Sequence, residues 1–352
     1  MRCATWSPGS AVRRILYYLP LLSHYWIMAR RRLSISTAVR QRVPRDARVL
    51  VAVSGGRDSM VLLHSMLAEQ RLLNLHVEVS HIDHGLRSDS ALDAEFVSNV
   101  CASWGVPCHI HRLPPRPDGE NIEAWGRSLR YREFGRIMSE RQLDLLVTAH
   151  TANDVAETLL MRLLANKELN TIEADDPVRR CARPLLEISR EQVDQYVEQQ
   201  ALSYREDPSN IDCSFVRNRI RHTVVPMLAE SFDRSIVWIL AEQATSIAQD
   251  CEALQKLAKE EAERVGSFCD GDPEWAQGLR EALSRVDESV RWRLIQQLWV
   301  PVVGFTVGRN KALAMAEVIM ARNGKLSLHS DLTLVSDHFG IRLQRSSSKL
   351  NE

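Results

Sequence analysis

A short segment after the first strongly apolar run, SGGRDS at positions 54–59, has the residue types of a phosphate-binding turn. Two glycines allow a tight turn and close approach of the backbone to a ligand. A helix that begins there would point free N–H groups at an anion, and an aspartate can hold Mg²⁺ against phosphates. The spacing and lysine of a Walker A loop are absent, so this is a different nucleotide loop. We assign nucleotide contacts to Ser54, Gly55, Gly56, Arg57, Asp58 and Ser59, with Asp58 also the Mg²⁺ ligand.

A second segment, HIDHGLR (81–87), follows the next apolar run and brings two histidines, a carboxylate and an arginine together. A zinc site would need a later partner at zinc spacing, and the sequence offers none. We therefore assign His81 and His84 to nucleotide contact, with a plain surface turn as the alternative.

A pair of acids, Asp154 and Glu157, follows the fourth apolar run. Residues three apart share one face of the first helical turn. Acids in that turn can simply complement the helix dipole, or they can hold Mg²⁺ or a cationic amine. Their expected position across from Asp58 favours a role in the site.

Arginines gather in two further segments. Arg127, Arg130 and Tyr131 share a predicted helix face, and RNRIR (217–221) carries three arginines. Clustered arginines suit contact with phosphate groups, whereas a solvated basic face is the usual alternative.

These groups need a scaffold, and the surrounding pattern predicts one. Short apolar runs alternate with amphipathic segments, which indicates an α/β fold with a parallel sheet and helices on both faces. Such sheets bind ligands at the carboxyl ends of their strands, where the loop, the histidines and the acid pair fall. The expected strands cover 47–54, 75–82, 107–112 and 143–150, and the expected helices cover 58–70, 89–104, 121–140 and 153–164.

Beyond residue 164 the pattern changes. Residues 166–180 have no period and predict a loop, and Ser189 with Gln192 forms a predicted capping box at the start of a helix. Further helices are expected at about 217–228, 232–264, 288–299 and 307–322, followed by short strands. We expect three parts: a basic extension (1–46), an ATP-binding catalytic domain (47–230) and a smaller, mainly helical domain (231–352).

Composition restricts the partners and the compartment. Lys+Arg and Asp+Glu both number 45, so net charge does not point to a polyanion and any nucleic-acid surface depends on where the charges lie. Seven cysteines without a C-x-x-C pair argue against a zinc ribbon, an iron–sulfur cluster and a disulfide framework. A reducing compartment, the cytoplasm, fits best.

The first 46 residues are basic, with nine arginines before the first acid, Asp46. The apolar stretch at 15–27 is too short to span a bilayer, so no membrane partner is expected. Three interpretations stay open: a disordered or mis-started extension with the working start at Met28, an organelle transit peptide, or a surface anchor.

Over about residues 47–228 the chain resembles the tRNA(Ile)-lysidine synthases, because seven segments occur in that family's order. They are SGGRDS, HIDHGLR, EAWGRSLRY (123–131), AHTANDVAET (149–158), RPLL (183–186), YREDPSN (204–210) and RNRIR. The resemblance implies an adenine nucleotide alpha hydrolase-like fold with a five-stranded type of parallel sheet and a pyrophosphatase-type loop (PP-loop). It also implies the short form of the family, which lacks a further C-terminal domain.

The resemblance further implies a two-step reaction. ATP would activate C2 of the wobble cytidine, position 34 of the CAU-anticodon isoleucine tRNA, with release of pyrophosphate. The amine of free L-lysine would then displace AMP and give lysidine. Asp154 and Glu157 would bind the amine or the metal, and Arg217 would join Asp58 among the catalytic residues. Contacts to the tRNA or the intermediate would come from Arg127, Arg130, Tyr131, Arg219 and Arg221, and a homodimer is left open.

Two positions depart from the family pattern. Thr151 stands where a second histidine is usual, and a glycine-rich turn is replaced by Leu164-Ala165-Asn166-Lys167-Glu168. Loss of glycine where the backbone must approach closely would strain or rebuild that loop. Two alternatives therefore stand beside lysidine synthesis: another PP-loop enzyme that modifies tRNA, or a relative that binds tRNA without modifying it.

Overall fold

The computed structural model describes residues 33–83, 85, 90–114, 122–165, 169, 171–206, 214–232 and 235–345. The chain forms two compact units that divide between Glu242 and Gln243, inside helix α10 (Ile236–Val265). His84 and residues 166–168, where the glycine-rich turn is replaced, lie outside the described residues.

The first unit is built on a six-stranded sheet in the order β3-β2-β1-β4-β6-β5. All neighbouring strands run parallel except β5 and β6, which are antiparallel. The predicted parallel sheet is confirmed, but β5 and β6 fall within and just after the predicted loop, because two-residue strands leave no period to detect. The strands are β1 (Arg48–Ala52), β2 (His76–Asp83), β3 (Cys108–Arg112), β4 (Leu145–Val147), β5 (Asp175–Asp176) and β6 (Cys181–Ala182).

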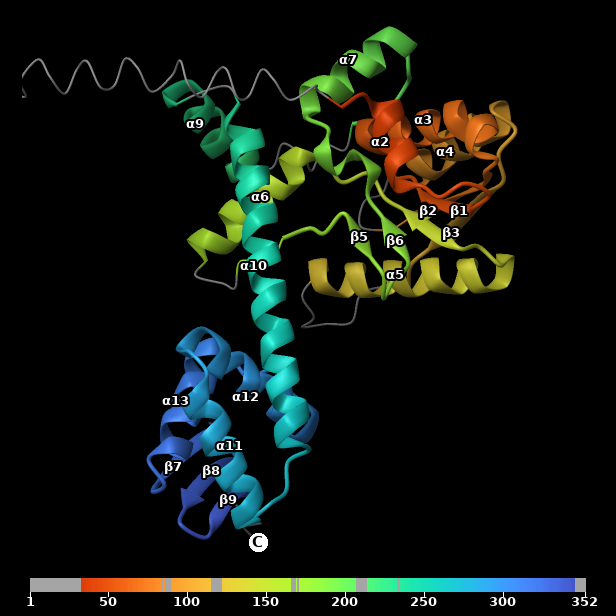
Figure 1. Ribbon diagram of the computed structural model, residues 1–352. Coiled ribbons are helices and arrows are strands. Elements are labelled where there is room, and N and C mark those ends of the chain that lie inside the picture. Colours follow the sequence, from red (N-terminus) through yellow and green to blue (C-terminus); the bar gives the residue numbers. More distant parts are fainter. Residues whose placement is uncertain are drawn as a thin grey trace, which may run out of the picture. The chain divides into compact units, whose positions relative to one another are not determined.

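Helices cover both faces of this sheet, as predicted (Figure 1). Successive residues of a strand point to opposite faces. Val49 and Val51 of β1 therefore join the core formed with α3 (Arg57–Leu73) and α4 (Ser90–Ser103). Leu50 instead joins the core formed with α5 (Ile122–Arg141) on the other face. Burial on both faces explains why β1 is almost continuously apolar.

The predicted basic extension is folded where the structure describes it. Helix α2 (Ile35–Arg42) buries Ile35 and Val39 in the same core as α3. Arg40 of α2 also forms an ion pair with Glu69 of α3, with Nε 2.6 Å from Oε2. The first unit therefore begins before residue 47. The sequence did not reveal this helix, because it is short and presents few apolar residues.

Helices after the sheet place the remaining site residues. Helices α6 (Ala152–Leu164) and α7 (Arg190–Gln200) match their predicted bounds closely. The predicted capping box is confirmed, since Ser189 Oγ accepts from Gln192 N and Ser189 N donates to Gln192 Oε1. RNRIR lies on the helical run of α8 (Val216–Arg219), a π-helical turn (Ile220–Val224) and α9 (Val225–Ser231).

The second unit has three further helices and a three-stranded antiparallel sheet, β7-β8-β9. Its core contains Trp275, Trp299 and, packed against them, Phe268. The sequence did not predict α11, whose start is capped by the Asp272 carboxylate and whose interior holds Gly278, a poor helix former. The elements are α11 (Pro273–Arg285), α12 (Glu288–Val303), α13 (Arg309–Met320), β7 (Gly324–His329), β8 (Leu332–Asp337) and β9 (Gly340–Arg345).

A search of the described residues finds no helix with the length and apolar character needed to span a membrane.

Candidate functional site

The loop between β1 and α3 has the backbone that its glycines predict. Gly55 has φ +88°, in the left-handed region, and a Cβ there would lie 3.3 Å from Val97 Cγ2. Gly56 is the N-cap of α3, and none of the side chains that the structure describes caps this helix end. The first-turn N–H groups therefore face the loop without a side-chain acceptor, which is the arrangement that binds phosphate groups.

The side chains of the two loop serines form hydrogen bonds with backbone groups of the loop. Ser59 Oγ donates to Gly56 O at 2.7 Å and accepts from Ser54 N at 3.2 Å. Ser54 Oγ accepts from Gly56 N at 3.3 Å. These bonds hold the turn in shape, so the serines have a structural role as well as the ligand role we assign to them.

His81 and Arg57 contact protein groups in this structure. His81 is buried, and its Nδ1 lies 2.9 Å from the carbonyl oxygen of Val53, to which it is hydrogen-bonded. It therefore fixes the end of β1 next to the loop. Arg57 Nη1 donates to Asp194 of α7. Both residues border the loop, whereas His84 is outside the described residues.

Asp58 has a carboxylate oxygen that needs a partner. Its side chain is 29% exposed, but the Oδ1 atom is buried and accepts no hydrogen bond in the described part of the chain. Burial, and then the neighbouring carboxylate of Asp154, raise the pKa of Asp58. A divalent cation between the two acids would relieve both effects.

The donor set fits Mg²⁺ better than a metal held by protein alone. Among the described residues no group of three or more His, Cys, Asp or Glu side chains could hold a metal ion. Mg²⁺ is usually held by one or two carboxylates together with substrate phosphates. Asp58, with Asp154 nearby, provides that number.

Asp154 links the start of α6 to the arginines of RNRIR. Its Oδ2 accepts from Thr151 N at 2.8 Å and from Thr151 Oγ1 at 3.1 Å. Its Oδ1 accepts from Arg217 Nη2 at 2.9 Å and Arg221 Nη2 at 3.4 Å. Burial would raise the pKa of Asp154, but Arg217 and the other donors hold it below its usual value. Thr151, the departure from the family pattern, thus helps to begin this helix.

Glu157 is almost fully buried and is satisfied by the same two arginines. Its Oε2 accepts from Arg217 Nε at 2.9 Å, and its Oε1 accepts from Arg221 Nε at 2.7 Å. The predicted acid pair therefore binds cationic groups, and in this structure those groups are the guanidiniums of Arg217 and Arg221. The predicted catalytic role of Arg217, and the predicted contact of Arg221 with tRNA or an intermediate, would require these arginines to leave or share the two carboxylates.

His150 is a site residue that the sequence assignment left out. Its Nδ1 lies 3.0 Å from Thr148 Oγ1, with which it is hydrogen-bonded. Burial lowers its pKa to about 4, with Arg183, Arg217 and Arg127 adding to the effect against the opposing charge of Asp154. The histidine in the AHTANDVAET segment was the available signal for it.

The second arginine group surrounds an aromatic ring. The guanidinium carbons of Arg127 and Arg179 lie 5.0 and 4.9 Å from the centre of the Tyr131 ring, at cation–π distance. Arg130 Nε is buried without a hydrogen-bond acceptor in the described residues, and burial lowers the pKa of Arg130. Arg179 was not predicted, because it comes from the segment expected to be a featureless loop.

The structure gathers some predicted residues and separates others. Asp58, Asp154, Glu157, Arg217 and Arg221 form one charged group at the carboxyl ends of β1 and β4. Arg219, on the same helical run, is exposed and donates to Ser214 O at 2.9 Å.

Comparison with known proteins identifies the family of the chain. Residues 30–228 match the PP-loop domain family. The tRNA(Ile)-lysidine synthase of Clostridium perfringens is 36% identical over 216 residues, which cover 59% of this chain and 46% of that protein. The Nostoc enzyme of the same name is 32% identical over 259 residues, covering 72% of this chain and 73% of that protein.

The fold itself also has a solved counterpart. The U34-tRNA thiolase NcsA from Methanococcus maripaludis superimposes with a TM-score of 0.54 and 16% identity, covering 61% of this chain and 78% of that chain. That likeness concerns the fold alone. The chain spans only about half the length of several curated relatives, such as the 46% of the Clostridium perfringens protein. The shared domain, the extent of the Nostoc match and the site geometry together place the chain in the tRNA(Ile)-lysidine synthase family of PP-loop proteins.

Proposed function

We propose that this chain ligates free L-lysine to C2 of the wobble cytidine of the CAU-anticodon isoleucine tRNA, using ATP. In the first step the cytidine oxygen at C2 attacks the α-phosphorus of ATP, and pyrophosphate leaves. In the second step the lysine amine, in its neutral form, attacks C2, the C2–O bond breaks, AMP leaves, and the new C–N nitrogen releases a proton to solvent. The observation that carries this proposal is the buried Asp58 oxygen beside Asp154, which accepts no hydrogen bond among the described residues and has only Arg57 Nε, at 3.8 Å, as an ion-pair partner.

The nucleotide half of the proposal rests on the loop. The uncapped N-terminus of α3 and the backbone around Gly55 and Gly56 provide N–H groups for the phosphates. Asp58 would hold Mg²⁺, with Asp154 as the second carboxylate. When bound, Mg²⁺ would neutralise the charge that develops on the leaving pyrophosphate.

The lysine half of the proposal rests on the acid pair. Asp154 and Glu157 already bind cationic side chains at hydrogen-bond distance, so their geometry suits an ammonium group. Arg217 is 36% exposed and Arg221 16%, which makes Arg217 the arginine that an entering amine would displace. Because its pKa is held at about 4, His150 is neutral at pH 7 and does not repel that amine.

Binding of the tRNA, which both halves of the proposal require, rests on Tyr131 and the arginines around it. Arg127 and Arg179 keep positive charge on the ring, and Arg130 has a buried N–H that needs an acceptor. A phosphate oxygen would satisfy Arg130 with a charge-assisted hydrogen bond. Arg219 is exposed on a separate helix and would give a peripheral contact.

Pyrophosphate release tests the proposal directly when each substrate is omitted in turn. With ATP, lysine and the CAU-anticodon tRNA transcript, the full chain should release pyrophosphate and AMP over many turnovers. Omission of tRNA should abolish release, and omission of lysine should limit it to about one equivalent per enzyme. Turnover with another nucleophile in place of lysine would favour a different PP-loop enzyme.

A second candidate function is tRNA binding without ligation. One observation favours it, because both carboxylates of the acid pair are already in ion pairs with Arg217 and Arg221. Under this alternative, tRNA binds to the chain while no pyrophosphate is released under any substrate combination.

A further inference from the structure

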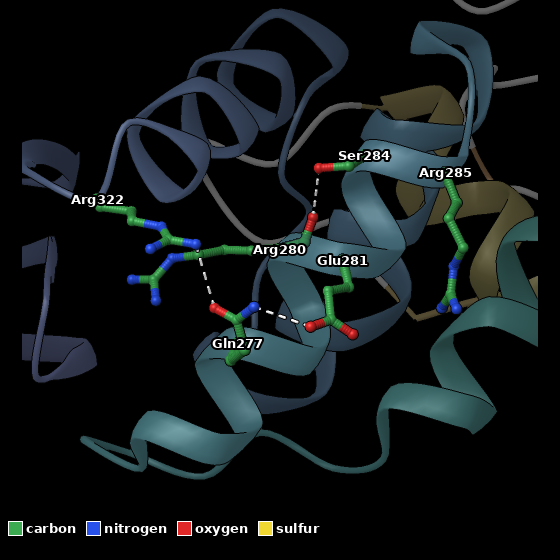
Figure 2. Close-up of a pocket in the computed structure, with 6 residues that line it drawn as sticks. All are labelled: Gln277, Arg280, Glu281, Ser284, Arg285 and Arg322. Carbon is green, nitrogen blue, oxygen red and sulfur yellow. Dashed lines mark hydrogen bonds between the residues drawn. The ribbon is translucent and has the colours of Figure 1, made fainter.

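A cavity of about 360 Å³ lies beside α11 in the second unit, and none of its lining residues has a role in the proposed reaction. The residues that line the cavity are all of polar or charged type, and three of them are arginines (Figure 2). The lining residues are Gln277, Arg280, Glu281, Ser284, Arg285 and Arg322.

Arg280 is a buried cation, and its hydrogen-bond acceptors among the described residues are all neutral groups. Only 7% of the residue is exposed. Its Nε donates to Ile319 O at 3.0 Å, and its Nη2 donates to Asp337 O at 2.9 Å and Ser336 Oγ at 3.3 Å. Burial, and then the charge of Arg322, lower the pKa of Arg280. Buried charges are normally paired with an opposite charge. The nearby carboxylate of Asp337 opposes this lowering, but it is paired with Arg342, so Arg280 has no direct ion-pair partner among the described residues.

Arg322 brings a second positive charge to the same place from a strained backbone position. It follows α13 with φ +57°, a conformation that favours Gly or Asn over a long side chain. Figure 2 shows its guanidinium beside that of Arg280, and the effect of Arg322 on the pKa of Arg280 agrees with this. Among the described residues, no carboxylate lies within ion-pair distance of either arginine.

The acid that lines the cavity does not neutralise these arginines. Glu281 Oε1 accepts from the amide of Gln277 at 2.8 Å, and the amide oxygen of Gln277 accepts from Arg322 Nη2 at 3.3 Å. A neutral amide therefore stands between the carboxylate and the guanidinium. Arg285 has a partner outside the cavity lining, since its Nη2 lies 3.4 Å from Glu261 Oε2.

From this juxtaposition we infer that the cavity is an oxyanion site that takes a phosphate group between Arg280 and Arg322. Guanidinium groups bind phosphate through paired, charge-assisted hydrogen bonds. Such a ligand would supply the missing counterion and account for an arginine at a left-handed position. The phosphate could belong to a free or nucleotide monophosphate, or to the backbone of a bound RNA. The inference does not depend on the activity proposed for the first unit.

Arg322→Asn tests the site in the full chain, because Asn tolerates the left-handed conformation and the variant should fold at least as well. Arg309→Asn is the matched control. It removes an exposed arginine from the other end of α13, where its partner is Glu288 at 3.8 Å. Thermal unfolding is measured in sodium phosphate and in sodium chloride at equal ionic strength, so that general screening cancels. Binding of a tRNA transcript is measured for the same three proteins across a salt series.

Two results would support the inference and identify the source of the phosphate. If the site takes a monophosphate, the Tm of the wild type and of the control should be higher in phosphate than in chloride. Arg322→Asn should bind phosphate about tenfold more weakly, so its Tm should rise less. If it takes an RNA backbone, Arg322→Asn should raise the Kd for tRNA several-fold and lower the salt slope by about one. Identical phosphate response and identical tRNA affinity in all three proteins would overturn it.

Discussion

Arg221 and Glu157 form a bidentate ion pair, in which Arg221 Nε donates to Oε1 at 2.7 Å and Nη2 donates to Oε2 at 2.9 Å. The two residues are 64 positions apart in the sequence. Burial would lower the pKa of Arg221, but its hydrogen bonds to Glu157 raise it. The pair joins α6 to the helical run that carries RNRIR, so it positions one side of the proposed site.

Arg221→Lys should destabilise the fold although it keeps the charge. A lysine cannot make the two parallel bonds, so the buried Glu157 loses one of its charge-assisted hydrogen bonds, although Arg217 still donates to Oε2. We expect a loss of about 2 kcal/mol in the free energy of unfolding, measured by urea denaturation. Arg219→Lys, on the exposed side of the same run, should change it by less than about 0.5 kcal/mol. Equal losses in the two variants would show that the fork geometry is unimportant.

Gly55→Ala should damage the nucleotide loop. The left-handed φ of +88° and the 3.3 Å approach to Val97 both oppose a Cβ. We expect about 1–2 kcal/mol of destabilisation and at least tenfold weaker ATP binding by calorimetry. Gly135→Ala is the control, because a Cβ there meets nothing within 4 Å in helix α5 and should stabilise by about 0.5–1 kcal/mol. Unimpaired ATP binding by Gly55→Ala would argue against the loop as the phosphate site.

The loop was predictable because its function depends on local residues. Two glycines between an apolar strand and a helix specify both the turn and the free N–H groups, and the structure has that turn at Gly55 and Gly56. The parallel sheet was predictable for the same reason, since short strand patterns such as β1, which is almost continuously apolar, alternate with amphipathic helical segments. Short elements were not, and the two-residue strands β5 and β6 and the helix α2 depend on tertiary contacts.

Asp58→Asn should abolish activity without harming the fold. Its pKa is raised, so the folded state disfavours the ionised carboxylate at neutral pH, and an uncharged amide removes that cost. The free energy of unfolding should stay constant or rise, while pyrophosphate release should fall at least a hundredfold. Asp250→Asn, at an exposed position on α10, should retain full activity. Undiminished release by Asp58→Asn would remove Asp58 from the metal site.

His150 should make the fold sensitive to mild acid. Its folded pKa of about 4 lies below the ordinary histidine value of 6.5, so the unfolded chain binds the proton more readily between those values. The stability that His150 contributes is present above pH 6.5 and is lost as the pH falls toward 4. His150→Gln should therefore reduce the acid-induced loss over this window by about 2 kcal/mol, as measured by urea denaturation at several pH values. Parallel pH curves for the two proteins would contradict the assignment.

Pairing within the site could not be predicted from the sequence. The spacing of Asp154 and Glu157 indicated a shared helix face, but it did not reveal that Arg217 and Arg221 would reach them from a helix some sixty residues later. Arg179 was missed because its contact with Tyr131 depends on the fold of a segment without a periodic pattern. Ion pairs between distant segments carry no local sequence signal.

Transfer of isotopically labelled lysine to the tRNA tests the central proposal most directly. The full chain is incubated with ATP, labelled lysine and the CAU-anticodon isoleucine tRNA, and the tRNA is digested to nucleosides and examined by mass spectrometry. We expect the label on the nucleoside from position 34 in an ATP-dependent manner, and no label with Asp58→Asn. Steady ATP consumption while the tRNA acquires no label, or tight tRNA binding without any ATP consumption, would contradict lysidine synthesis by this chain.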